Sequence, residues 1–104
     1  MTSFITHNQD HTINQKVYGT HFEGRIEIPY KDLVKKLGEP MFGDGEKVQV
    51  EWVLEFDDGT VATIYDWNDS RSVHAIDDWH IGGFNSDAVE HIQDLFHDCV
   101  AEIF

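Results

Sequence analysis

The fold of this 104-residue chain is decided by residues 47–67, which read KVQVEWVLEFDDGTVATIYDW. Apolar and polar side chains alternate over residues 47–56, and a period of two is typical of a β-strand with one buried face. The residues expected on that buried face are Val48, Val50, Trp52, Leu54 and Phe56. The dipeptide Asp58-Gly59 is a common two-residue turn between antiparallel strands. The stretch therefore predicts a central β-hairpin in an antiparallel sheet.

The two-residue turn also predicts how the two strands pair. It places Trp52 opposite Tyr65, so that these two rings and Trp67 share a face, for which the ordinary role is the core. The same register places Glu51 opposite Asp66 on the outer face. Like charges directly across a ladder destabilise it, so this pairing indicates that acidic side chains are placed for a purpose other than folding.

The sequence before the hairpin predicts one or two strands and a short helix. Residues 16–28 are rich in β-forming side chains and are interrupted by glycine, which favours a strand with a bend or bulge. Residues 30–37 have apolar side chains at the i, i+3, i+4 and i+7 positions of a helix, which Gly38 ends. Residues 1–15 are polar and without period, and we expect a flexible N-terminal tail or a loosely docked edge there.

A further strand and a helix are predicted after the hairpin. Residues 73–81 read as a strand that stops at two glycines, and Asn85 or Ser86 begins a helix that runs to the C-terminus. The whole pattern predicts an α+β fold: a small antiparallel sheet of about four strands, packed by the long C-terminal helix, with the short helix beside it. Residues 16–104 are expected to form this single domain.

Charge is the unusual feature of the composition, with a formal net value of −13. Residues 1–37 carry five Lys and Arg against four Asp and Glu, for a net of +1, whereas residues 38–104 carry two against sixteen, for a net of −14. A free-standing nucleic-acid-binding protein needs a basic footprint, so this class is excluded, and adhesion to anionic membranes is disfavoured. The ordinary alternative is that acidity keeps a small protein soluble.

Part of this charge follows one face of the last predicted helix. Four of its carboxylates are spaced strictly at i, i+4, and like charges at that spacing destabilise a helix. Four helical residues rise ~6 Å, which is comparable to the phosphate spacing along a nucleic-acid strand. We therefore expect the acidic hairpin face and the helix to bind a basic partner. The residues expected on this surface are Glu51, Glu55, Asp66, Asp87, Glu90, Asp94, Asp98 and Glu102.

Residues that carry reaction chemistry are scarce. The seven histidines lack the spacing of a zinc site, and the lone Cys99 lies on the apolar stripe of the last helix as a small core residue. No apolar run approaches the ~20 residues of a membrane span, and the N-terminus lacks a secretory signal. The sequence predicts a cytoplasmic protein that is not an enzyme and takes no cofactor or metal.

A ligand pocket is the alternative to a partner-binding surface. In this interpretation Trp67 or Trp79 stacks a purine, while Arg71 and the amides of Gly82 and Gly83 meet phosphate. The chain would then sequester a nucleotide second messenger. The acidic composition opposes this interpretation, because phosphate must pass an anionic surface.

Three segments carry a resemblance to known proteins. They are GEKVQVEW (residues 45–52), DGTVATIYDW (58–67) and WHIGG (79–83), and they resemble small acidic proteins encoded by tailed bacteriophages. The resemblance covers roughly residues 38–100 and brings no catalytic residues with it. It implies an anti-defence context, since such proteins often inhibit host nucleases or CRISPR effectors, and others sequester nucleotide signals.

The sequence is compatible with three functions. The first is a non-enzymatic inhibitor that mimics nucleic acid and occupies the basic nucleic-acid-binding surface of a host defence protein, without itself binding nucleic acid or membrane. The second is the nucleotide-sequestering protein, and the third is a small structural or accessory phage protein. A homodimer is compatible with each of them.

Overall fold

The computed structural model describes residues 4–6, 19–43 and 45–96. The elements in chain order are β1 (Phe4–Thr6), β2 (His21–Glu27), α2 (Tyr30–Leu37), β3 (Met41–Phe42), β4 (Val50–Phe56), β5 (Val61–Tyr65), the 3-10 turn η2 (Val73–Ala75), β6 (Asp78–Gly83) and α3 (Asp87–Leu95). Over these ranges, no helix is long and apolar enough to cross a membrane.

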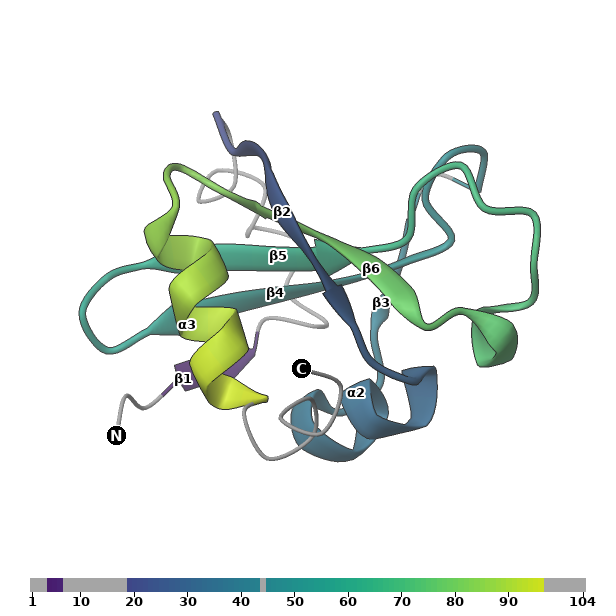
Figure 1. Cartoon of the computed structure of the whole chain (residues 1–104), viewed down its shortest axis with the longest axis horizontal. Coiled ribbons are helices and arrows are strands. Elements are labelled where there is room, and N and C mark those ends of the chain that lie inside the picture. Colours follow the sequence, from purple (N-terminus) through teal and green to yellow (C-terminus); the bar gives the residue numbers. More distant parts are fainter. Residues whose placement is uncertain (1–3, 7–18, 44, 97–104) are drawn as a thin grey trace.

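The strands form one antiparallel sheet against which α3 packs (Figure 1). In the described ranges the sheet has six strands in the order β1-β4-β5-β6-β2, with β3 also paired to β4. Helix α3 contacts β6, β2 and β5, and α2 adds Leu33 and Leu37 to the core. The predicted α+β class, the central hairpin and the presence of both helices are confirmed, but the last helix is shorter than predicted, because α3 ends at Leu95 with Phe96 as its C-cap. The sheet also contains β1 and β3, which were not among the four expected strands. Both are too short to show the alternation of apolar and polar residues by which a strand is predicted.

The hairpin turn is one residue longer than predicted. The Phe56 N–H donates to the Thr60 carbonyl at 2.8 Å, and the Gly59 N–H donates to the Phe56 carbonyl at 2.9 Å. Gly59 has a φ of +90°, so the turn has three residues, the last of them in the left-handed region that glycine favours. The Thr60 N–H also donates to Asp58 Oδ1.

This longer turn shifts the strand register by one residue, and two predictions are wrong as a result. Glu51 pairs with Tyr65, not with Asp66, so no like-charge pair crosses the ladder here. Trp52 pairs with Ile64, which places Tyr65 on the opposite face of the sheet from Trp52. The predicted inward face of the first strand is confirmed for Val50, Trp52, Leu54 and Phe56, which are all buried.

Two tryptophans form the centre of the core on the α3 side of the sheet. Trp52 and Trp79 are fully buried and meet edge to face with ring centroids 5.5 Å apart. Their indole N–H groups donate to the carbonyls of Gly38 and Ile28 at 2.8 and 2.9 Å. These bonds tie the segments on either side of α2 to the core, because a buried indole nitrogen needs an acceptor.

The sheet approaches α3 closely at a glycine that was predicted to end a strand. Gly83 lies within β6, and a Cβ atom built there would stand 2.4 Å from the Cβ of Ala88. The strand continues two residues beyond the predicted end at residue 81 and begins later than predicted, since η2 occupies the first part of the 73–81 segment. At the start of α3, Asn85 Oδ1 accepts the Asp87 N–H at 2.9 Å, as a capping residue does.

The predicted tail contains a strand. Residues 4–6 form β1, in which Phe4 pairs with Phe56 and their rings lie 6.0 Å apart, so these three residues are docked at the edge of the sheet and are not part of a free tail. Residues 7–18 and 97–104 lie outside the described ranges, and the predicted core position of Cys99 lies among them.

Candidate functional site

The sheet divides the predicted acidic surface into two parts. Phe56 contacts His91 of α3 with ring centroids 4.7 Å apart, so the alternate residues Glu51 and Glu55 lie on the face away from α3. We call that face the open face. Asp87, Glu90 and Asp94 are exposed on α3, on the other side of the sheet. The structure therefore does not bring the strand carboxylates Glu51 and Glu55 onto one surface with the helix carboxylates, and the predicted positions 98 and 102 lie outside the described residues.

Asp66 belongs to the fold and not to a binding surface. Its side chain is fully buried, and Oδ1 accepts the N–H groups of Gln49 and Val50 at 2.9 and 3.0 Å. At the start of β4, where β5 has just ended, this carboxylate therefore accepts the backbone N–H groups in place of a strand carbonyl. Its second oxygen, Oδ2, has no hydrogen-bond partner among the described residues. A fully buried group cannot meet a partner protein, so the prediction that Asp66 binds one is corrected.

The α3 side of the molecule presents a set of carboxylates that we call the acidic tip. It combines exposed residues of α3 with those of the β4–β5 turn, namely Asp57, Asp58, Asp87, Glu90 and Asp94. His91 joins the two elements, because its Nε2 lies 2.7 Å from Asp58 Oδ2 and its Nδ1 lies 2.9 Å from the Asp87 carbonyl. The turn and the helix are therefore held together, and their carboxylates form one surface.

The contacts of His91 indicate that its ring carries a positive charge. Both ring nitrogens face oxygen acceptors, and only the imidazolium form donates from both. Burial opposes protonation of His91, but the hydrogen bonds that the ring donates to Asp58 and to the Asp87 carbonyl outweigh it and raise the pKa of His91. The pKa of Asp58 falls to about 2, first because of the Thr60 backbone N–H and then through Thr60 and His91 side-chain contacts.

The negative charge of Asp94 is the one on α3 that the stability of the helix explains least. Asp87 and Glu90 lie in the first turn of α3, where the helix dipole favours anions. Asp94 lies one turn after Glu90 near the other end, where the dipole disfavours a negative charge, and the last described turn has no basic residue. Glu90 and Asp94 thus place two like charges on one exposed face of the helix.

The residues of the predicted nucleotide pocket are not brought together. Trp79 lies in the core, whereas Trp67 is 49% exposed and stacks on His80, whose side chain is on the open face. Gly82 and Gly83 are buried in β6. The guanidinium of Arg71 is bound by Asp69, with Nη2 and Oδ2 2.7 Å apart. Phosphate would have to displace this carboxylate.

The open face holds an aromatic group that the sequence analysis did not predict. The rings of Phe22, Tyr65 and Trp67 lie 4.9, 5.6 and 6.5 Å from the ring of His80. The one-residue register error had moved Tyr65 and Trp67 to the core face. The sequence does indicate one member of this group. Neighbouring residues of a strand point to opposite faces, so a buried Trp79 places His80 on the open face.

Charged groups surround these rings. Lys47 Nζ lies 5.6 Å from the centre of the Trp67 ring, and Arg25 Nη1 lies 3.6 Å from Asp78 Oδ2. Burial raises the pKa of Glu51, and burial together with the charge of Glu51 raises the pKa of Tyr65. Burial, followed by the charge of Arg25, lowers the pKa of His80, so this ring is neutral at pH 7.

Over the described ranges, no group of three or more His, Cys, Asp or Glu side chains is arranged to hold a metal ion. Comparison of the chain with protein-family models, curated proteins and solved structures finds no match in any of the three.

Proposed function

We propose that this chain is a non-enzymatic inhibitor that uses the acidic tip to occupy a basic, nucleic-acid-binding surface of another protein. The observation that carries the proposal is the exposed pair Glu90 and Asp94 on a helix, α3, that has no Lys or Arg. The helix dipole favours a cation at the position of Asp94, and the repulsion between Asp94 and Glu90 at i, i+4 is not relieved by any basic residue of α3.

The geometry of the acidic tip supports recognition through charge. His91 holds the β4–β5 turn against α3, so the carboxylates of both elements are ordered before a partner arrives. An ordered set of charges costs less conformational entropy on binding than a flexible one. Complementary charge also accelerates association and is screened beyond ~10 Å at 0.1 M salt.

The partner class follows from the sign of the surface and from the sequence resemblance. A row of carboxylates is complementary to the Lys and Arg residues that line a nucleic-acid channel. The resemblance to phage proteins adds the context of a host nuclease or CRISPR-type effector in the host cytoplasm. Inhibition would then arise because the acidic tip and the nucleic acid compete for the same channel.

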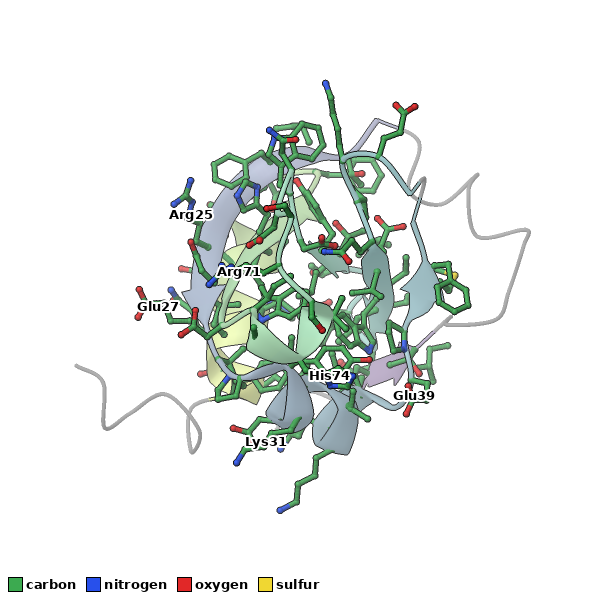
Figure 2. All side chains as sticks on the ribbon, turned by 90° about the vertical axis from the view of Figure 1, so that its right-hand side faces the viewer. Arg25, Glu27, Lys31, Glu39, Arg71 and His74 are labelled. Carbon is green, nitrogen blue, oxygen red and sulfur yellow. The ribbon has the colours of Figure 1, made fainter. Side chains whose placement is uncertain are left out.

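The test is a pull-down from host lysate at two ionic strengths with three forms of the protein. These are the wild type, the tip variant Glu90→Lys/Asp94→Lys, and the control Glu27→Lys/Glu39→Lys. Glu27 and Glu39 are exposed and point away from the body of the molecule (Figure 2), so the control makes the same change in net charge outside the acidic tip.

The proposal predicts that wild type and control retain a nucleic-acid-handling protein at low salt and release it at high salt. The tip variant should retain none of it. Equal retention by the tip variant and the wild type would contradict the proposal. So would a captured partner whose binding is unchanged by salt, because rim charges must be screened.

A further inference from the structure

The second feature that points to a binding partner is Glu51 on the open face. This residue lies between two other strands, paired with Met41 of β3 on one side and with Tyr65 of β5 on the other. Residues directly opposite on a ladder have Cβ atoms about 5 Å apart, so the thioether and the phenol ring flank the carboxylate. Glu51 is only partly exposed as a result.

No cationic side chain among the described residues forms an ion pair with Glu51. A carboxylate that is partly removed from water and lacks a counter-ion is costly to the fold. Burial raises its pKa as expected for such a group. The fold tolerates this cost, and a cation supplied from outside would remove it.

The neighbouring aromatic rings are suited to a planar cation. Tyr65 and Trp67 meet edge to face with centroids 6.4 Å apart, and Trp67 and Phe22 are 49% and 50% exposed. Lys47 already places an ammonium group 5.6 Å from the Trp67 ring, which shows that a cation is compatible with this ring. His80 between them is neutral, so it does not repel a cation.

We propose that the open-face cluster, formed by Phe22, Glu51, Tyr65, Trp67 and His80, binds an arginine side chain presented by a protein partner. The guanidinium donates hydrogen bonds to the Glu51 carboxylate and stacks on the adjoining rings of Tyr65 and Trp67. His80 and Phe22 extend the aromatic surface beyond them. Arginine fits better than lysine, because its planar group stacks and donates two parallel hydrogen bonds at once. This site is separate from the acidic tip and does not depend on it.

Charge favours a protein partner over a nucleic acid at this site. Single-stranded nucleic acids also stack on exposed aromatic rings, but their sites run along a positively charged groove. Here Glu51 and Asp78 lie on the same face as the rings, and Arg25 is already paired with Asp78 at 3.6 Å. In a chain of net charge −13, phosphate would approach against the field of the whole molecule.

The test is a titration followed by NMR on the full chain labelled with ¹⁵N. The probes are the peptide acetyl-GRGRG-amide, the same peptide with citrulline in place of arginine, and oligothymidylate. Citrulline keeps the planar shape of arginine and removes its charge. The variants are Glu51→Gln and Trp67→Ala, with Glu39→Gln as the control for loss of one exposed carboxylate. Trp67→Phe, which keeps an aromatic ring, replaces the alanine variant should that one not fold.

We expect the arginine peptide to shift the Trp67 indole N–H signal and the Tyr65 and His80 amide signals in a saturable way. Citrulline and the Glu51→Gln variant should each weaken binding roughly tenfold, the factor that one charge-assisted hydrogen bond provides. Trp67→Ala should abolish the shifts, and Glu39→Gln should leave them unchanged.

Three results would overturn the proposal. They are equal binding of the arginine and citrulline peptides, shifts confined to α3, and tighter binding of oligothymidylate than of the arginine peptide at the cluster. Shifts confined to α3 would still agree with the function proposed for the acidic tip. The two proposals can therefore fail independently.

Discussion

Replacing Asp66 should destabilise the protein without changing what it binds. Oδ1 accepts two backbone N–H groups, from Gln49 at 2.9 Å and from Val50 at 3.0 Å. A hydrogen bond to a charged group contributes about 1.5–3 kcal/mol, and removal of a buried carboxylate with one unpaired oxygen offsets part of that loss. We therefore expect Asp66→Ala to lower the free energy of unfolding by about 2–4 kcal/mol. In a domain of this size, Tm should fall by roughly 10–20 °C.

Asp66→Asn should be less harmful than Asp66→Ala. The asparagine oxygen can still accept both N–H groups, but without the charge, and its amide nitrogen takes the place of Oδ2, which has no described partner. We expect a loss of about 1–2 kcal/mol. Glu39→Ala is the control, because it removes an exposed carboxylate. Its free energy of unfolding should stay within about 0.5 kcal/mol of the wild-type value.

Urea unfolding at pH 7, followed by tryptophan fluorescence, measures these differences. The reasoning requires the order wild type, Asp66→Asn, Asp66→Ala in decreasing midpoint. An Asp66→Ala midpoint equal to that of the wild type would refute it, because the two hydrogen bonds would then contribute nothing. Loss of partner binding in a folded Asp66→Asn protein would also refute it, because a buried side chain cannot be part of the contact.

Two further predictions concern α3 and its contacts. Because the pKa of His91 is raised above 6.5, its ion pair with Asp58 should stabilise the fold fully below pH 6.5, and this contribution should be lost as pH rises through the folded-state pKa. Urea midpoints measured from pH 5 to 9 should show this slope in the wild type and not in His91→Gln; an equal slope in both would contradict the assignment. Gly83→Ala should cost about 1–3 kcal/mol, since its Cβ would stand 2.4 Å from that of Ala88, and an unchanged Tm would show that α3 shifts freely.

The fold was largely predictable, but the turn of the hairpin was not. The sequence Asp57-Asp58-Gly59-Thr60 suits a two-residue turn, yet it equally suits a three-residue turn with glycine in the left-handed region. The difference is one residue, and a slip of one residue moves every side chain to the other face. That is why Trp52 was placed correctly and Tyr65 was not.

The candidate site was predictable only on the helix, where the spacing of residues along the sequence shows which side chains share an exposed face. The i, i+4 spacing identified Glu90 and Asp94, and both are exposed. The sequence predicts Asp66 as a surface charge, because nothing local in it shows that this carboxylate accepts the amides at the start of β4. The open-face cluster depends on the pairing of β5 with β6, a contact between distant segments that only the tertiary structure provides.

The central claim, that the acidic tip competes with nucleic acid, is tested most directly by displacement. A fluorescent DNA or RNA is first bound to the host protein that the wild type captures, and its anisotropy is followed as each form is added. The wild type and Glu27→Lys/Glu39→Lys should displace the nucleic acid in proportion to the amount added, while Glu90→Lys/Asp94→Lys should displace none. Full displacement by the tip variant, or none by the wild type, would contradict the claim.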